Sequence, residues 1–443
     1  MTRPASILIK NGTLATQNPR DDFFQGDIWI DNGRIEQVGR RVARRADTTI
    51  DASGKLVLPG FVQTHVHLCQ TLMRGAADDL SLLDWLKHRI WPLEAAHDSA
   101  SLRVSAQLGL AELIRGGTTT VLTMETVHDT DVVFEEAEHS GIRARIGKCL
   151  MNAGQGVPKR LIQPARNALA ECETLHRRWH GASEGRLGLA LAPRFILSCT
   201  EKLLRDADAL ASSLGLLIHT HASENRDEVR QVRRLTGKGN IEAFHTFGLL
   251  HERLCVAHCV WVTEKERRLL RETGTRVLHC PSSNLKLGSG IAPVWKMLQS
   301  GTSVSLGADG APCNNNLDMF QEMRLAALLQ KALHGPEAMP ATRVLRMATL
   351  GGAEALGLND EIGSLEVGKR ADVIVANLEN LHCSPAIDPV TTLVYSAKST
   401  DVDTCIVDGR ILMKGGELVT LDRQRILRES QGQFRRLVDR AKL

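Results

Sequence analysis

The pattern of hydrophobic positions differs between the middle of the chain and its ends. From residue 59 to residue 365, short apolar runs alternate with longer stretches of helical periodicity, such as 101–115 and 317–331. Short apolar runs are typical of parallel strands buried on both faces, and their alternation with helices over about 250 residues predicts a (β/α)8 TIM barrel. The runs interpreted as strands are 118–122, 187–191, 216–218, 254–257, 276–278 and 303–306.

The two ends instead alternate polar and apolar positions around turn signals. Near the start the alternation breaks at Asn32-Gly33, and near the end it breaks at Asp408-Gly409. Both dipeptides favour type I′ turns, which need positive φ at both central residues, so each end is predicted to contain a β-hairpin. We expect one small sheet domain, separate from a barrel domain at 59–365 and assembled from both termini, residues 1–58 and 366–443.

The composition of the chain argues against nucleic-acid binding, membrane insertion and export. Lys and Arg number 55 against 51 Asp and Glu, and the resulting charge of +4 is too small and too dispersed to favour nucleic-acid binding. No apolar leader follows Met1 and no stretch reaches the roughly 18 apolar residues of a membrane span, so neither export nor membrane insertion is expected. The 10 Cys contain no C-x-x-C pair, which favours reduced thiols and a cytoplasmic location.

Metal-ligand side chains follow four of these predicted strands and a fifth apolar run at 58–62. The C-terminal ends of barrel strands form the active-site mouth, so side chains at these positions are expected to converge. A His-x-His pair on a strand also places both imidazoles on one face. One such pair could equally be two buried histidines without a ligand, but His or Asp at five strand ends indicates a single site. The residues are His65, His67, His219, His221, His258, His279 and Asp309.

Imidazole and carboxylate ligands with an open position suit a catalytic Zn²⁺, although Fe²⁺ and Mn²⁺ accept the same set. Such an ion would lower the pKa of its bound water to about 7. Glu224 lies three residues after His221, close enough to share that water and carry protons. The alternative is a solvated loop acid, an interpretation that fits Asp227 and Glu228 better than Glu224.

Competing chemistries lack their sequence signatures. The chain contains no P-loop, no dinucleotide-binding G-x-G-x-x-G after a strand, no H-E-x-x-H and no G-x-S-x-G. The P-C-x-x-C half of the cytidine-deaminase signature is also absent, because three Asn follow Pro312-Cys313. These absences leave a metal-dependent hydrolase on a barrel as the favoured reading.

The motifs around these residues resemble the amidohydrolase superfamily from end to end. They comprise Pro59-Gly60-Phe-Val-Gln-Thr-His-Val-His67, His221 with Glu224, Ala257-His258-Cys259, His279-Cys-Pro-Ser-Ser-Asn284 and Gly307-Ala-Asp309-Gly310. The resemblance implies a TIM barrel with a small β-sandwich domain formed from both chain ends. The most similar branch contains the 5′-deoxyadenosine, methylthioadenosine and S-adenosylhomocysteine deaminases, some of them labelled N-ethylammeline chlorohydrolase. The segments that carry this finer similarity are 63–75, 83–86, 90–94 and 308–315.

The resemblance also implies roles for individual residues. The metal ligands would be His65, His67, His221 and Asp309. Glu224 would shuttle a proton to the purine ring, His258 would orient the attacking water, and Asp309 would pass its proton to the leaving amine. His279 would shape the pocket. Binuclear relatives use a carboxylated Lys on a barrel strand, and since none of the predicted strands ends in Lys, we expect one divalent metal ion, Zn²⁺ before Fe²⁺.

Two readings of the substrate remain open at this stage. Asp84 and Trp85 match an acidic–Trp pair that lies by the ribose in adenosine-type deaminases, so a buried contact from Asp84 to the sugar is expected. Gln70 and Arg194, the latter in Pro193-Arg194-Phe195, instead resemble guanine deaminases. We therefore predict deamination of a 5′-modified adenosine to the inosine analogue and ammonia, by a homo-oligomer. The alternatives are guanine deamination, triazine chloro- or aminohydrolysis, and a non-catalytic scaffold, which the retained ligands disfavour.

Overall fold

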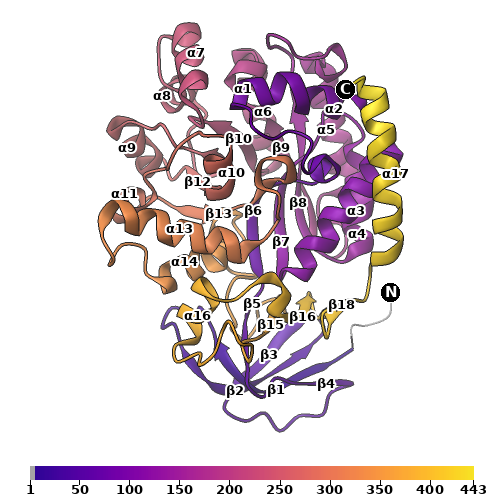
Figure 1. The fold of residues 1–443 in the computed structure, drawn as a ribbon, viewed down its shortest axis with the longest axis vertical. Helices are drawn as coiled ribbons and strands as arrows, with labels where there is room; N and C mark the ends of the chain where they lie inside the picture. Colours follow the sequence, from indigo (N-terminus) through magenta and orange to yellow (C-terminus); the bar gives the residue numbers. More distant parts are fainter. Residues whose placement is uncertain (1–4) are drawn as a thin grey trace.

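The computed structural model describes residues 5–443, which form two separate sheets with helices around the second (Figure 1). The first sheet contains nine strands in the order β18-β17-β16-β15-β5-β1-β2-β3, with β4 paired to β1. All of its strands come from the chain ends. They are β1 (Ile7–Ala15), β2 (Phe23–Asp31), β3 (Arg34–Gly39), β4 (Thr48–Asp51), β5 (Lys55–Pro59), β15 (Val373–Asn377), β16 (Val402–Val407), β17 (Arg410–Lys414) and β18 (Glu417–Leu418).

The two predicted hairpin turns lie against each other in this sheet. Asn32 and Gly33 have φ of 51° and 76°, and Asp408 and Gly409 have φ of 53° and 70°, as type I′ turns require. A Cβ on Gly33 would lie 2.8 Å from the carbonyl oxygen of Asp408, so only glycine permits this approach. The prediction of a sheet assembled from both chain ends is confirmed, whereas the domain limits stay a prediction.

The second sheet is the predicted parallel barrel. Its nine segments follow the order β13-β12-β11-β10-β9-β8-β7-β6-β14. The chain passes directly from β13, paired with β12, to β14, paired with β6, and the hydroxyl of Thr64 donates to the carbonyl of Leu306 at 2.9 Å across this seam. The segments are β6 (Phe61–His67), β7 (Thr118–Met124), β8 (Arg143–Leu150), β9 (Leu187–Pro193), β10 (Ile218–Ala222), β11 (Leu254–His258), β12 (Arg276–His279), β13 (Val304–Leu306) and β14 (Asp309–Gly310).

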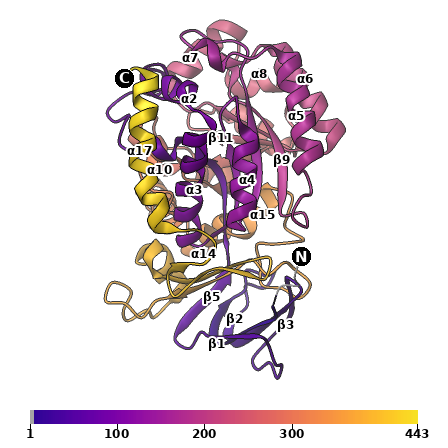
Figure 2. The ribbon, with the colours of Figure 1, turned by 90° about the vertical axis from the view of Figure 1, so that its right-hand side faces the viewer.

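Helices surround the barrel, and the last of them, α17, packs along α3 and α2 (Figures 1 and 2). This helix, Arg423–Ala441, lies within residues 366–443, which we expected to belong to the sheet domain. The α-helices are α1 (Leu82–Trp85), α2 (Trp91–Ala96), α3 (Ser99–Arg115), α4 (Thr130–Ser140), α5 (Ala165–Trp179), α6 (Glu201–Leu214), α7 (Arg226–Thr236), α8 (Asn240–Thr246), α9 (Glu264–Glu272), α10 (Pro281–Lys286), α11 (Val294–Gln299), α12 (Ala311–Asn314), α13 (Met319–His334), α14 (Ala341–Ala348), α15 (Leu350–Ala355), α16 (Pro389–Tyr395) and α17 (Arg423–Ala441). Shorter helical turns are η1 (Leu68–Met73), the π-helix η2 (Leu86–Ile90), η3 (Lys159–Leu161), η4 (Ile196–Ser198) and η5 (Ser399–Asp401).

A buried ion pair joins the barrel to the chain-end sheet. The guanidinium of Arg143, on β8, donates to both carboxylate oxygens of Asp372, at 2.8 and 2.9 Å. Asp408, in the β16–β17 turn, lies 3.4 Å from the same guanidinium. All three side chains are buried. The positive charge that Arg143 places at the base of the barrel is therefore paired with carboxylates from the segments of the chain-end sheet.

All ten cysteines are free and buried. Within residues 5–443, no helix combines the length and the apolar character needed to cross a membrane.

Candidate metal centre and active site

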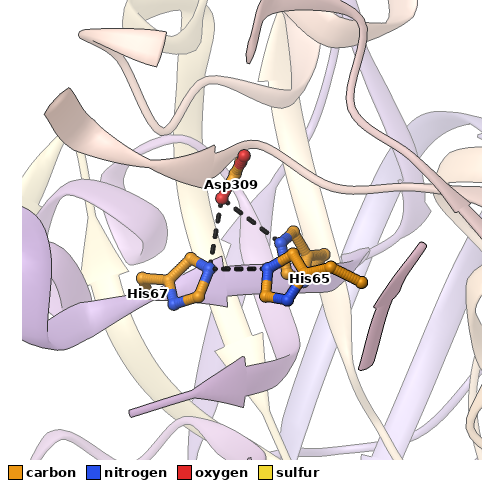
Figure 3. A group of neighbouring side chains, drawn as sticks. His65, His67 and Asp309 are labelled. Atoms are coloured by element: carbon orange, nitrogen blue, oxygen red, sulfur yellow. Dashed lines mark hydrogen bonds and ion pairs between the residues drawn. The ribbon is translucent and has the colours of Figure 1, made fainter. Parts of the chain in front are cut away.

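Four side chains converge at the C-terminal ends of the barrel strands (Figure 3). His65 and His67, two residues apart on β6, each place Nε2 3.2 Å from Oδ1 of Asp309 at the start of β14. Nε2 of His221, on β10, lies 3.4 Å from Nε2 of His67. One ligand atom from each of the four lies within 4.8 Å of the others. The group contains the four predicted metal ligands and no other residue.

Backbone carbonyls orient two of these imidazoles. Nδ1 of His67 contacts the carbonyl of Met124 at 2.7 Å, and Nδ1 of His221 contacts the carbonyl of Arg194 at 2.8 Å. A carbonyl accepts only, so each Nδ1 carries a proton, and the neutral form of each ring presents the lone pair of Nε2 to the group. This is the arrangement that a metal-binding histidine requires.

His65 is oriented through a second histidine. Its Nδ1 lies 2.6 Å from Nε2 of His219, whose own Nδ1 lies 3.2 Å from the carbonyl of Thr123. The carbonyl fixes a proton on Nδ1 of His219, which leaves its Nε2 to accept from Nδ1 of His65. His65 therefore also faces the group through an unprotonated Nε2. His219, a strand-end histidine without an assigned role in the sequence analysis, positions a ligand.

The electrostatics of the group fit a cation. Burial lowers the pKa of His65 to about 4 and lowers the pKa of His221 well below its usual value, so both rings are neutral at pH 7. Burial alone would raise the pKa of Asp309, but the adjacent His65 and His67 hold it well below the ordinary range. Two imidazole lone pairs thus face one carboxylate oxygen at 3.2 Å, an arrangement that a divalent ion between them would stabilise.

Glu224 and His258 lie beside the ligand group. Nε2 of His258, at the end of β11, is 3.4 Å from Oε2 of Glu224 and 3.8 Å from Oδ2 of Asp309. Oδ1 of Asn284 lies 2.9 Å from Nδ1 of His258, and the hydroxyl of Ser283 donates to Oδ2 of Asp309 at 2.6 Å. Helix α10, which carries Ser283 and Asn284, therefore holds two of the predicted catalytic residues in place.

The backbone at these positions is strained. His258 and Asp309 have φ of 74° and 64°, and Ser223, which precedes Glu224, has φ of 55°. Non-glycine residues adopt this left-handed conformation only where the surrounding structure enforces it, commonly at functional sites. These three residues lie in or next to the ligand group, so the backbone strain and the side-chain chemistry indicate the same functional site.

A lysine does occur on the barrel strand that the hydrophobic pattern missed. Lys148 lies two residues before the end of β8 and is fully buried. Its ammonium donates to the carbonyl of Val127 at 2.6 Å and to Oε1 of Gln163 at 3.0 Å. These contacts hold Lys148 away from the ligand group described above.

A small cavity of about 30 Å³ adjoins the ligand group. Of the predicted substrate residues, Gln70, Trp85 and Arg194 line it, together with Glu224 and His258. His279 is buried beside His258 but does not line the cavity, and neither of its ring nitrogens has a hydrogen-bond partner in the described chain. The full lining is His67, Gln70, Leu82, Trp85, Leu86, Arg194, Phe195, His221, Glu224, Glu228, His258 and Asp309.

The predicted contact of Asp84 with the ribose stays a prediction, and Asp84 does not line this cavity. Asp84 lies on the outer face of the short helix α1, where its exposed carboxylate accepts from the hydroxyl of Ser81 at 2.9 Å. Trp85 takes the inward position and is buried.

Sequence reasoning missed a buried carboxylate behind the cavity. Glu94, on α2, accepts from Nε2 of Gln70 at 2.8 Å and from the Arg194 guanidinium at 2.5 and 3.1 Å. All three side chains are at most 3% exposed. The segment containing Glu94 carried part of the family resemblance, but nothing in the pattern indicated which of its residues would be paired with Arg194.

Sequence reasoning also misplaced Glu228. We interpreted Asp227 and Glu228 together as solvated loop acids, and this holds for the half-exposed Asp227. Glu228 is instead buried and lines the cavity beside Glu224. The capping-box spacing, with Glu228 three residues after Asn225 at the start of α7, was the signal that could have shown this.

Comparisons with known proteins agree with the motifs. The family model described as the amidohydrolase family matches residues 56–412. A 5-methylthioadenosine/S-adenosylhomocysteine deaminase of Desulforudis audaxviator is 40% identical over 439 residues, 98% of this chain and 99% of that protein. A 5′-deoxyadenosine deaminase of Methanosarcina mazei is 39% identical over 438 residues, again 98% and 99% of the two chains. The structure of an adenosine deaminase from Xanthomonas campestris with bound zinc superposes with a TM-score of 0.92 at 31% identity, covering 99% of this chain and 100% of that one. This chain therefore belongs to the amidohydrolase family.

Proposed function

We propose that the protein catalyses hydrolytic deamination of a 5′-modified adenosine, 5′-deoxyadenosine first, to the inosine analogue and ammonia. The methylthioadenosine and S-adenosylhomocysteine types are the next candidates. The observation that carries the proposal is the convergence of His65, His67, His221 and Asp309 with Glu224 and His258 above them. The names of the full-length relatives support the substrate class.

We propose that His65, His67, His221 and Asp309 hold one divalent ion, Zn²⁺ before Fe²⁺. Three imidazoles and one carboxylate match the ligand preferences of both ions, and the zinc in the Xanthomonas structure favours the first. When bound, such an ion supplies a water whose pKa is lowered toward neutrality. The remaining steps depend on side chains of this chain.

Three side chains would handle the protons. Burial, with the negative charges of Asp309 and Glu228, raises the pKa of Glu224 well above its usual value, which favours the acid form that can donate to a ring nitrogen. With its Nδ1 proton donated to Asn284, His258 offers Nε2 as an acceptor to the attacking water. Oδ2 of Asp309, on the His258 side, can take the water's proton and deliver it to the amine.

Guanine is the second candidate substrate, because Gln70 and Arg194 both line the cavity. Both side chains donate to Glu94, which holds them in place and leaves further N–H groups on each. Trp85 is the side chain that we propose to pack on the ribose.

The cavity is roofed by α1 and η2 through Leu82, Trp85 and Leu86. Its volume of about 30 Å³ is room for little more than a water molecule. Substrate binding therefore requires these roof side chains to move outward and then to close over the purine, which would exclude bulk water from the proton transfers.

A substrate panel tests the proposal. Ammonia release would be measured for 5′-deoxyadenosine, methylthioadenosine, S-adenosylhomocysteine, adenine, guanine and a chlorotriazine, with Trp85→Ala alongside the wild type. We expect nucleosides to exceed adenine at least tenfold in kcat/KM, and Trp85→Ala to lower only the nucleoside values. Strong guanine or triazine turnover without nucleoside activity would contradict the proposal. Self-association and a cytoplasmic location stay predictions.

A further inference from the structure

The turn that presents Glu224 is held by another carboxylate. Ser223 has φ of 55°, and Glu224 follows it directly before the N-cap of α7 at Asn225. Oε2 of Glu228 accepts the backbone N–H of Glu224 at 2.7 Å and that of Asn225 at 3.4 Å. An ordinary capping box reaches back only to the N-cap residue, whereas this one reaches one residue further, to Glu224 itself.

The other oxygen of Glu228 is also fixed. Oε1 accepts from the side-chain amide of Asn240, at the start of α8, and Glu228 is 1% exposed. The carboxylate thus ties two helices to the backbone of Glu224. By contrast, the Glu224 side chain has little support, since its Oε1 has no hydrogen-bond partner in the described chain and its Oε2 lies 3.4 Å from Nε2 of His258. The direction of the Glu224 carboxyl depends on its backbone, and the backbone depends on Glu228.

We propose that Glu228 is a positioning residue for proton transfer: by bonding the backbone N–H of Glu224, it holds the strained Ser223–Glu224 turn and aims the Glu224 carboxyl at the reacting ring. The proposal rests on the proposed function for the role of Glu224. It differs from simple helix capping because Asn225 already caps α7 with its own side chain, accepting from the N–H of Asp227 at 2.9 Å.

The substitutions Glu228→Ala and Glu228→Gln separate this role from a general effect on folding. Alanine removes the acceptor. Glutamine keeps a carbonyl oxygen for the Glu224 N–H, and Asn240, whose Oδ1 has no partner in the described chain, can turn its amide to accept from the new NH₂ group. Asp227→Ala is the matched control, because it removes an acid from the same helix turn but a half-exposed one paired with Arg230.

Steady-state kinetics, metal content and melting temperature would be measured on the metal-loaded enzyme with its best nucleoside. We expect Glu228→Ala to lower kcat at least tenfold with KM within about threefold and metal content unchanged, because general acid–base groups contribute factors of 10²–10⁴ and misalignment loses part of that. Glu228→Gln and Asp227→Ala should stay within about threefold of the wild type.

A normal kcat in Glu228→Ala overturns the proposal, as does a loss of activity that follows metal content, or a glutamine variant as slow as the alanine one. Should Glu228→Ala not fold, Glu228→Asp withdraws the carboxylate by one methylene and is expected to show the same kcat loss. A wild type inactive on every nucleoside would count against the proposed function instead, and a crystal structure of Glu228→Ala would still test the positioning, through the placement of Glu224.

Discussion

His219 offers a test of how the metal centre is built, because it contacts no predicted substrate and is not itself a ligand. Replacing His219 with Phe removes the acceptor for Nδ1–H of His65, a contact of 2.6 Å in a side chain with no exposed surface. The free Nδ1–H would find no water, and His65 could rotate or change tautomer. Loss of such a supporting partner typically weakens metal affinity by about 10–100-fold, or roughly 1.4–2.7 kcal/mol.

The assay is competition with a chelator of known affinity, together with a thermal melt of the metal-free protein. His279→Phe is the matched control, since it replaces a buried strand-end histidine whose two nitrogens make no hydrogen bond within residues 5–443. We expect metal affinity to fall in His219→Phe, to remain in His279→Phe, and to recover partly in His219→Gln, which restores an acceptor. An unchanged affinity in His219→Phe would refute the proton assignment around His65.

Three further outcomes follow from the site and its support. Asp309→Asn should lose both bound metal, measured by elemental analysis, and nearly all activity. Retained metal would contradict its role as a ligand, and retained activity would contradict its role in proton transfer. Since burial raises the pKa of Glu224, its acid form persists to a higher pH than that of an ordinary carboxyl and is lost as the pH rises through the raised value, so kcat should fall as the pH rises through it. If the residual kcat of Glu224→Gln still falls as the pH rises, the titrating group is a residue other than Glu224. Arg143→Ala, which strands the buried Asp372, should lower the free energy of unfolding by about 3–5 kcal/mol in a denaturant titration. A loss below about 1 kcal/mol would show that the pair does not hold the barrel on its sheet.

The parts of the fold that could be predicted are those in which local chemistry and tertiary structure agree. The turns at Asn32-Gly33 and Asp408-Gly409 need positive φ wherever they occur, so the sequence alone identifies both hairpins. The strand β8 could not be found in this way, because Arg143, Arg145 and Lys148 break its apolar run. Each of these charges is satisfied by a group distant in sequence, which a hydrophobic pattern does not contain.

The candidate site also contains residues that could be predicted from the sequence and residues that could not. The ligands could be placed because strand ends converge in any barrel, so His65, His67 and Asp309 needed only their positions in sequence. The support around them comes from tertiary contacts that no spacing encodes, such as Glu94 with Arg194. The sequence also did not indicate that Asp84 is exposed while Trp85 is buried, because a motif gives the residue types of a pair without the helical face that each will occupy.

The most direct test of the central claim is a metal titration of the deaminase activity. The enzyme would be stripped with a chelator, reconstituted with increasing Zn²⁺, and assayed for conversion of 5′-deoxyadenosine to 5′-deoxyinosine and ammonia. The account predicts no activity in the stripped enzyme and a linear rise that ends at about one ion per chain, as a single group of His65, His67, His221 and Asp309 requires. Full activity without metal, or a rise that continues to two ions per chain, would contradict it.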